Sequence, residues 1–296
     1  MRAATCSDYL TDEMANALII YNAGKPDAAR RAQETAQWLR ASGYGVALAD
    51  QPTAARWNQP PDPNLAIVIT LGGDGTLLTG ASIAAPAGAP LLGVHMGRFG
   101  FIAQVEPDEI IDALQRWHAG DCQIQERLMV QARVEGEVRV SVALNEITLL
   151  RTPTSPMLNF TIRINDLLLT TYPADGSLVA TPTGSTAYAL SAGAPVVHPL
   201  TEALVLAPIS PHTLGARPLV LPPNARIRID LDCAATNEPN AQAIMTTDGR
   251  RHQTLTMGQA IHITTAPYRT KLLSFNEGEF FEKLRDRLLW GARVNE

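Results

Sequence analysis

The chain has 296 residues, of which 46% are apolar and 18% charged, and its formal net charge is −5. This composition excludes a disordered chain, because disordered chains lack the apolar side chains whose burial offsets the entropy of ordering. The acidic balance argues against a nucleic-acid-binding surface, which needs clustered Lys and Arg to neutralise phosphates. A chain of this length is expected to form about two domains.

The cysteines and the N-terminal residues bear on the cellular compartment. Cys6, Cys122 and Cys233 lie far apart and form no C-x-x-C pair, so neither a disulfide framework nor a zinc site is expected. The N-terminus carries acidic residues where a signal peptide would have a basic start. The apolar run at residues 65–71 is too short to span a bilayer. We therefore expect a cytoplasmic protein without membrane contact.

The first part of the chain alternates between short apolar runs and helical spacing. Strands are predicted at residues 17–21, 46–49, 66–70 and 91–94, and helices at residues 27–42 and 108–118. Continuous apolar strands that alternate with helices are typical of a parallel sheet covered on both faces. The sequence therefore predicts an α/β domain with a parallel, Rossmann-like sheet over residues 1–122.

From about residue 124 the hydrophobic pattern changes to a period of two. Strands are predicted at residues 138–142, 160–164 and 226–230, with hairpin turns at Asn165-Asp166 and Asp248-Gly249. We therefore expect an all-β domain, a β-sandwich, over residues 123–275. Residues 280–290 have helical apolar spacing, which predicts a C-terminal helix that docks back within the tail 276–296.

A glycine-rich loop, Gly72-Gly73-Asp74-Gly75-Thr76, directly follows the third predicted strand and precedes a segment that could begin a helix. Glycines let backbone N–H groups approach an anion, and a helix N-terminus adds partial positive charge, so the loop predicts phosphate binding. The carboxylate of Asp74 would repel phosphate unless a metal ion or a reacting hydroxyl lay between them, which favours a catalytic role. The loop alone leaves several kinase families open, and an ordinary turn with a solvated Asp is the alternative.

A second loop, residues 181–191, follows a predicted strand that contains Asp175. Its hydroxyl-bearing residues offer the donors and acceptors that the phosphates and sugars of a nucleotide require; they are Thr181, Thr183, Ser185 and Thr186. The side chain of Tyr188 could stack on a base, although a tyrosine at such a position more often belongs to the core.

On these motifs the chain resembles the NAD kinase family. The resemblance rests on the following segments: 72–76, 97–101, Asn145-Glu146, 175–199, and 208–214 with Arg217-Pro218. A Gly-Gly-Asp-Gly loop is shared with lipid kinases and, in variant form, with phosphofructokinases, whereas the string at 181–191 is specific to NAD kinases. The similarity runs from about Ala66 to the C-terminal strands.

The resemblance implies transfer of the γ-phosphoryl group of ATP, or of polyphosphate in some members, to the 2′-hydroxyl of the adenosine ribose of NAD, which makes NADP. Asp74 is then the proton acceptor, and Mg²⁺ or another divalent cation accompanies the donor, with no metal ligand expected from the protein. The implied phosphate-binding residues are Gly72, Gly73, Gly75 and Thr76. The implied NAD-binding residues are Asn145, Glu146, Asp175, Thr183, Thr186, Ala187, Tyr188, Ala189, Leu190 and Ser191. A homodimer or homotetramer is a further family expectation.

Some positions depart from the family pattern, and two other functions remain open. Gln104, Pro156 and Pro173 stand where many members have an acidic, polar or basic residue, and Arg250 either reaches the ligand or is solvated. A lipid kinase of the same loop type is one alternative. A non-catalytic dinucleotide-binding regulator is the other, although a protein that only binds has no need of Asp74.

Overall fold

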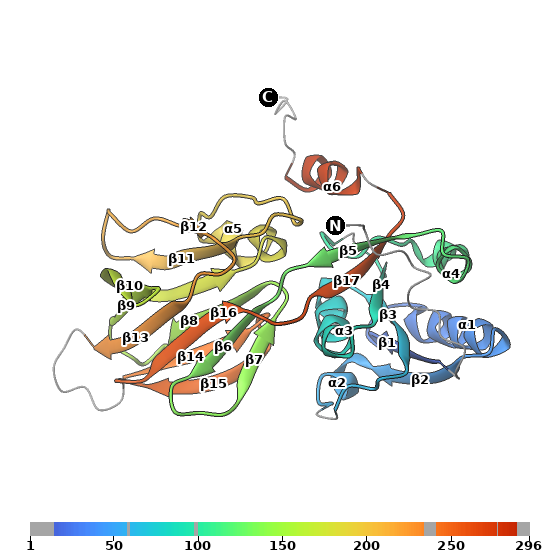
Figure 1. Cartoon of the computed structure of the whole chain (residues 1–296), viewed down its shortest axis with the longest axis horizontal. Coiled ribbons are helices and arrows are strands. Elements are labelled where there is room, and N and C mark those ends of the chain that lie inside the picture. Colours follow the sequence, from blue (N-terminus) through green and yellow to red (C-terminus); the bar gives the residue numbers. More distant parts are fainter. Residues whose placement is uncertain (1–14, 58–59, 98–99, 234–240, 277, 289–296) are drawn as a thin grey trace. The chain divides into compact units, whose positions relative to one another are not determined.

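The computed structural model describes residues 15–57, 60–97, 100–233, 241–276 and 278–288 (Figure 1). The chain divides into two compact units, the first made of Met1–Glu126 with Thr270–Glu296 and the second of Arg127–Arg269. Among the described residues, no helix is both long and apolar enough to cross a membrane.

The first unit is built on a six-stranded sheet in the order β2-β1-β3-β4-β17-β5. Its strands are β1 (Asn16–Tyr21), β2 (Gly45–Asp50), β3 (Leu65–Gly72), β4 (Pro90–His95), β5 (Gln123–Arg127) and β17 (Thr270–Ser274). The neighbouring pairs from β2 to β17 are parallel. Strands β3 and β4 are buried almost throughout, as continuous apolar runs in a covered parallel sheet should be. The predicted parallel α/β fold is confirmed.

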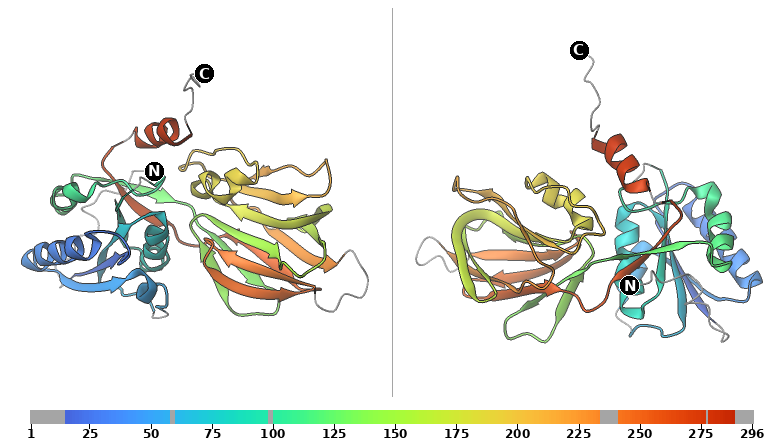
Figure 2. Two further views of the ribbon diagram at one scale, coloured as in Figure 1. Left: turned by 180° about the vertical axis from the view of Figure 1, so that it is seen from behind. Right: turned by 45° about the horizontal axis from the view of Figure 1, so that its top comes forward.

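Helices cover this sheet, as the views in Figures 1 and 2 show. They are α1 (Ala28–Ala41), α2 (Gln51–Ala54), α3 (Asp74–Ala87) and α4 (Ile110–His118), which follows the 3₁₀ turn η2 (Pro107–Glu109). A further helix of this unit, α6 (Glu279–Leu288), follows β17 and does not lie over the sheet. The apolar residues at helical spacing in α1 are fully buried in the core of this unit, together with Trp117 of α4; they are Ala28, Ala32, Ala36 and Leu39. Helical spacing in the sequence therefore identified the buried face of α1 correctly.

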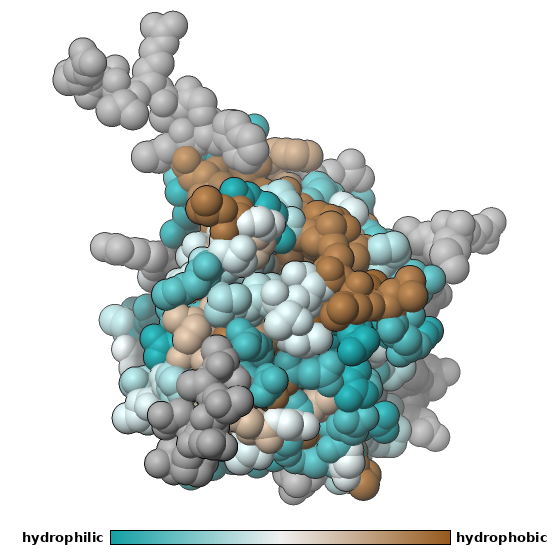
Figure 3. All heavy atoms as spheres, turned by 90° about the vertical axis from the view of Figure 1, so that its left-hand side faces the viewer, coloured by the Kyte–Doolittle hydropathy of each residue, from teal (hydrophilic) through white to brown (hydrophobic). Residues whose placement is uncertain are grey.

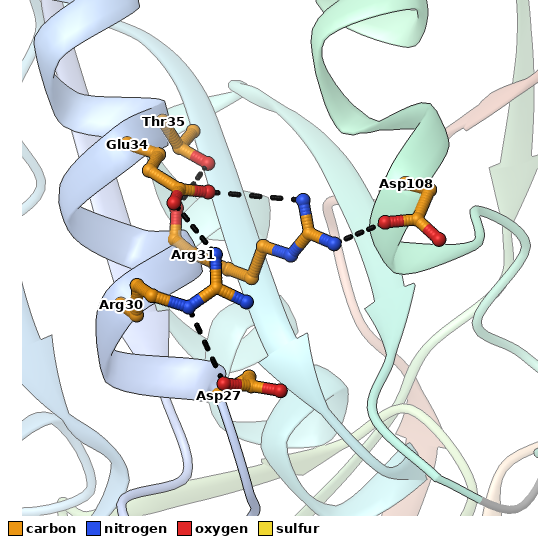
Figure 4. A network of polar contacts seen from close by, with 6 residues as sticks. All are labelled: Asp27, Arg30, Arg31, Glu34, Thr35 and Asp108. Atoms are coloured by element: carbon orange, nitrogen blue, oxygen red, sulfur yellow. Dashed lines mark hydrogen bonds and ion pairs between the residues drawn. The ribbon is translucent and has the colours of Figure 1, made fainter.

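Polar contacts join the outer faces of α1 and η2 (Figure 4). Arg30 bonds Glu34 at 2.6 Å and Asp27 at 3.3 Å, and Arg31 pairs with Asp108 across the two elements. The two Arg30 pairs join side chains that are about half exposed. Exposed ion pairs contribute about 0–1 kcal/mol each, so buried apolar packing rather than this network holds the helices in place.

Helix α3 sets the position of the glycine-rich loop. It starts at Asp74, two residues after the last residue of β3, and it ends at Ala87, followed by Gly88, whose φ of 71° forms a left-handed C-cap. A Cβ on Gly80 would lie 2.4 Å from Thr70 of β3, so this glycine lets the helix pack closely on the sheet. The loop thereby lies at the carboxyl end of a parallel strand, where open α/β sheets bind their ligands.

The second unit is an antiparallel sheet of eleven strands. The order is β15-β14-β8-β10-β9-β13-β16-β6-β7, and β11 pairs with β10 and β12. The strands are β6 (Val130–Val134), β7 (Val140–Ala143), β8 (Glu146–Arg151), β9 (Leu158–Ile164), β10 (Leu167–Ala180), β11 (Leu204–Pro211), β12 (Leu219–Leu221), β13 (Ile227–Cys233), β14 (Gln242–Thr247), β15 (Arg251–Thr256) and β16 (Ala260–Thr265). The predicted all-β domain is confirmed, as one hydrogen-bonded sheet that curls around its own core (Figure 2).

Both predicted hairpin turns are present. Asn165 and Asp166 have φ values of 50° and 70° between β9 and β10, and Asp248 and Gly249 have values of 51° and 66° between β14 and β15. Positive φ at both central residues is the type I′ geometry that matches the twist of antiparallel strands. The strand predicted from residue 138 begins later, at Val140, because the turn at Gly136 leaves Val138 96% exposed.

Two strands extend the first unit beyond the expected boundaries. The all-β domain was expected to span 123–275, but β5 and β17 belong to the sheet of the first unit. A short alternating strand does not reveal in its sequence which sheet it joins, since that depends on distant partners.

Two other expectations concern α6 and Cys122. Helix α6 lies where the C-terminal helix was expected, and Trp290 lies outside the described residues. Contrary to expectation, Cys122 is disulfide-bonded.

Replacing Phe160 tests the core of the second unit. Its ring is fully buried and stacks on Tyr172 with the ring centroids 6.1 Å apart. Phe160→Ala should lower the free energy of unfolding by about 3–5 kcal/mol, because it removes a large buried side chain and leaves a cavity. Urea unfolding followed by circular dichroism measures this loss. Val138→Ala is the matched control, with an expected change within about 0.5 kcal/mol; equal effects of the two changes would contradict the packing described here.

Candidate active site

Asp74 is held by the backbone of a second motif. Its carboxylate accepts a hydrogen bond from the N–H of Phe101 at 2.9 Å and another from the N–H of Ile102 at 3.3 Å. A Cβ on Gly100 would lie 1.9 Å from an Asp74 carboxylate oxygen, so only glycine permits this approach. Gly100 and Phe101, the last two residues of the 97–101 motif, therefore contact the glycine-rich loop directly, which sequence reasoning did not foresee.

The other residues of the glycine-rich loop differ in their surroundings. The hydroxyl of Thr76 is buried and donates to Gln51 Oε1 at 2.9 Å, and a Cβ on Gly72 would lie 2.1 Å from that hydroxyl. These two residues brace the loop. Gly73 has an extended backbone and faces open space where a Cβ would lie, and Gly75 is half-buried. The first N–H groups of a helix have no intrahelical acceptor, so the start of α3 can bind an anion.

In the second unit, a buried carboxylate orients the Asn145-Glu146 pair. Asp248 accepts hydrogen bonds from three successive amides, those of Leu144 at 3.0 Å, Asn145 at 2.7 Å and Glu146 at 3.3 Å. Its positive φ in the β14–β15 turn directs the side chain back toward β8. Sequence reasoning identified Asp248 only as a turn residue, because a turn Asp gives no sign of which distant amides it will bind.

The second loop packs against the same segment. The hydroxyl of Thr181 donates to Leu144 O at 2.6 Å, its amide donates to Asn145 O at 2.8 Å, and a Cβ on Gly184 would lie 2.2 Å from Asn145 O. The hydroxyl of Ser185 bonds Pro182 O at 2.7 Å and the amide of Val197 at 2.9 Å. The interpretation of Thr181 and Ser185 as ligand donors was wrong, since both hydroxyls are buried and used within the protein.

Three buried acceptor atoms of the expected site have no hydrogen-bond partner. They are Asn145 Oδ1, Glu146 Oε2 and Thr183 Oγ1. Asn145 is 7% exposed and Glu146 is 5% exposed. Buried polar atoms in folded proteins are almost always hydrogen-bonded, and leaving one unpaired costs about 1–3 kcal/mol. The arrangement is therefore suited to a ligand that brings hydroxyl or amino donors.

The remaining expected residues fall into two groups. Thr186 is the last residue of the 3₁₀ turn η3 (Thr183–Thr186), and Ala187 is the N-cap of α5 (Tyr188–Ser191). The backbone of Tyr188 forms a hydrogen bond with the Glu146 carboxyl. Ala189 is buried in a small core, whereas Tyr188 is 38% exposed, as a stacking platform requires. Asp175 lies apart: it bonds Arg151 at 2.7 Å, at the opposite end of β8 from Glu146. Five residues of strand separate these two positions by roughly 16 Å.

Burial changes the acid–base behaviour of this site. Burial, reinforced by the nearby charge of Asp248, raises the pKa of the Glu146 carboxyl to about 7. Burial also raises the pKa of Asp248 to about 6, against the effect of its three amide hydrogen bonds. Burial likewise lowers the pKa of the neighbouring Arg250. Burial makes the charged form of the Glu146 carboxyl unfavourable, and a ligand that donates hydrogen bonds to this carboxyl would stabilise the charged form.

The raised pKa of Glu146 predicts a pH-dependent stability. In the folded protein this carboxyl keeps its proton up to about pH 7, whereas its ordinary pKa is 4.5. The folded state therefore holds more protons between these values, so the free energy of unfolding falls as pH rises through this window. Glu146→Gln should flatten this dependence and stabilise the ligand-free protein at pH 8 by about 1–3 kcal/mol. Urea unfolding between pH 5 and 8 measures it, and Glu282→Gln is the exposed control; parallel curves for wild type and Glu146→Gln would refute the assignment.

Comparison with known proteins identifies the family. Residues 53–122 match the ATP-NAD kinase N-terminal domain, and residues 144–275 match the ATP-NAD kinase C-terminal domain. The NAD kinase of Heliobacterium modesticaldum is 37% identical over 92% of this chain and 98% of that protein, and the NAD kinase of Geobacter sulfurreducens is 35% identical over 88% and 94%. These comparisons give no support to the lipid-kinase alternative.

Solved structures agree with this result. Yeast NADH kinase complexed with NADH superposes with a TM-score of 0.85 at 25% identity, covering 97% of this chain and 91% of that one. An NAD kinase from Archaeoglobus fulgidus in complex with ATP gives a TM-score of 0.70 at 26% identity, covering 91% and 98%. With relatives matched over nearly their full length and the same fold in both solved kinases, the chain belongs to the NAD kinase family.

Proposed function

We propose that this protein transfers the γ-phosphoryl group of Mg²⁺–ATP to the 2′-hydroxyl of the adenosine ribose of NAD. The observation that carries the proposal is the group of unpartnered buried acceptors on Asn145, Glu146 and Thr183, three residues that the family resemblance assigns to NAD. The printed names of the relatives, NAD kinase and NADH kinase, and the ATP and NADH in two solved structures support the same reaction.

The Asn145-Glu146 pair is suited to the ribose and adenine of NAD. A carboxylate accepts two hydrogen bonds from a sugar diol, and an amide oxygen accepts one from a hydroxyl or amino group. A ligand bound there would supply the partners that Asn145 Oδ1 and Glu146 Oε2 lack. Hydrogen bonds to the charged carboxylate favour ionisation, so NAD binding is expected to lower the pKa of Glu146 and release a proton. Tyr188, half-exposed beside this pair, is the proposed stacking residue.

Asp74 is the proposed proton acceptor. As the 2′-oxygen forms its bond to the γ-phosphorus and the bond to the β,γ-bridging oxygen breaks, the hydroxyl proton passes to the Asp74 carboxylate. A carboxylate is a weak base toward a sugar hydroxyl, so its main effect is to orient the nucleophile and take the proton late. Two of the roughly four acceptor positions of a carboxylate are used by Phe101 and Ile102, which leaves others for the hydroxyl.

The phosphate donor is proposed to bind at the start of α3. The amides at Gly73, Asp74 and Gly75 are placed where a helix N-terminus favours negative charge. Mg²⁺ would enter on the donor phosphates, whose oxygens are the ligands that this ion prefers. Polyphosphate is the second donor to be tested. The proposed location is the cytoplasm.

The chain is also proposed to form a homo-oligomer. Figure 3 shows apolar side chains gathered in a band on the face that it displays. Leu167, Leu168 and Leu169 at the start of β10 are 75%, 60% and 47% exposed, and Leu169 and Leu219 line one cavity of about 410 Å³. Exposed apolar patches of this kind mark interaction surfaces. Light scattering should give a mass of two or more chains of 31.9 kDa each, and the mass of a single chain at micromolar concentration would contradict the proposal.

The proposed reaction is tested by incubating the purified chain with ATP, Mg²⁺ and NAD. NADP should accumulate and be detected with an NADP-specific dehydrogenase. Parallel reactions with polyphosphate and with NADH define the donor and acceptor. Absence of product with every donor would overturn the proposal.

The role of Asp74 is tested in the same assay. Asp74→Asn removes the proton acceptor but keeps the shape of the side chain, so turnover should fall by at least about 100-fold. NAD binding, measured by calorimetry, should stay within about threefold of wild type, since a tenfold change corresponds to 1.4 kcal/mol. Asp166→Asn, in an exposed hairpin turn, is the control. Near-normal turnover of Asp74→Asn would refute the role while leaving the reaction intact.

A further inference from the structure

Helix α6 places a buried lysine against the loop that holds Asp74. Lys283 is only 6% exposed, and its ammonium group donates to the carbonyl of Ala103 at 2.6 Å and to that of Phe101 at 3.3 Å. A buried charge is unfavourable unless it is hydrogen-bonded, and lysine is rarely buried otherwise. These carbonyls therefore fix both the lysine and the loop.

The first of these contacts continues to Asp74 through a single peptide group. The carbonyl of Phe101 accepts from Lys283, and the N–H of the same peptide group, that of Ile102, donates to Asp74 Oδ1. A positively charged donor at the carbonyl oxygen polarises the peptide group and strengthens the hydrogen bond made by its N–H. Lys283 thus both orients the donor of Asp74 and makes it a better donor.

The second contact ties the loop to the central sheet. The carbonyl of Ala103 accepts from Lys283, and the N–H across that peptide, Gln104, donates to Gly93 O of β4 at 3.0 Å. A Cβ on Gly93 would lie 3.1 Å from the Ala103 backbone, so the loop rests directly on the strand. The hydrogen bonds from Lys283 and the contact with β4 together fix the position of residues 101–104. In that position the amides of Phe101 and Ile102 are directed at Asp74.

We propose that Lys283 is a positioning residue for phosphoryl transfer: through residues 101–103 it holds the Asp74 carboxylate in its productive orientation. The inference rests on the proposed role of Asp74. A purely structural reading, in which Lys283 only anchors α6, predicts a loss of stability without a specific loss of turnover. Small displacements of a reacting group are costly in enzymes, so a positioning residue should show itself in kcat.

The test is Lys283→Met, which keeps the length of the side chain and removes the charge and its hydrogen bonds. Lys271→Met is the matched control, because Lys271 donates to Gly88 O at 3.1 Å, at the opposite end of α3 from Asp74. We expect kcat of Lys283→Met to fall at least about tenfold, with KM for NAD and for ATP within about twofold of wild type. The control should retain wild-type kcat. Equal kcat values for the two variants, or a change in KM alone, would overturn the proposal.

An activity-independent measurement follows the loop itself. In ¹⁵N-labelled protein, hydrogen exchange of the Phe101 and Ile102 amides should accelerate at least tenfold in Lys283→Met and remain unchanged in Lys271→Met. Unchanged exchange at both amides would show that Lys283 does not hold the loop, even if the variant were less stable.

A double variant separates this inference from the role of Asp74. If Lys283 acts through Asp74, then adding Lys283→Met to Asp74→Asn should lower the residual turnover by less than twofold. A further tenfold loss would mean that Lys283 acts by another route. Should Asp74→Asn itself retain turnover, the proposed proton acceptor fails, and the exchange measurement still reports whether Lys283 holds the loop.

Discussion

In each unit, a carboxylate bonded to the backbone amides of a distant segment organises the candidate functional residues. Asp74 binds the amides of Phe101 and Ile102 in the first unit, and Asp248 binds those of residues 144–146 in the second. A charged acceptor on a backbone donor gives a hydrogen bond about twice as strong as a neutral pair. It also fixes a peptide plane, so these contacts hold the two loops in defined conformations.

The second unit is locally destabilised at the residues that are proposed to bind NAD. The hydroxyls of Thr181 and Ser185 form hydrogen bonds within the protein that hold the loop in place. Side-chain oxygens of Asn145, Glu146 and Thr183 are buried beside it without a hydrogen-bond partner. Such atoms raise the free energy of the ligand-free fold, and the large buried core around Phe160 offsets the cost.

Local patterns predicted what depends on local structure. The apolar runs of β3 and β4 and the helical spacing of α1 were evident from the pattern of apolar residues, and both hairpin turns from their Asn-Asp and Asp-Gly residues. Roles that depend on partners far away in the chain were not. Three such roles are the pairing of β17 with β4 in the sheet of the first unit, the binding of three amides by Asp248, and the burial of Lys283 against residues 101–103. Each joins segments roughly a hundred residues apart or more, and no short sequence pattern encodes such a pairing.

Because β17 and α6 come after the second unit in the chain, the first unit is interrupted by an insertion of more than a hundred residues. Contacts of such long sequence separation form late and slowly. During synthesis the ribosome will have released Asp74 and its loop long before it reaches Lys283, so this contact becomes available only after the whole second unit has been made. The loop around Asp74 should therefore reach its final conformation only after α6 has been synthesised, because Lys283 lies on that helix.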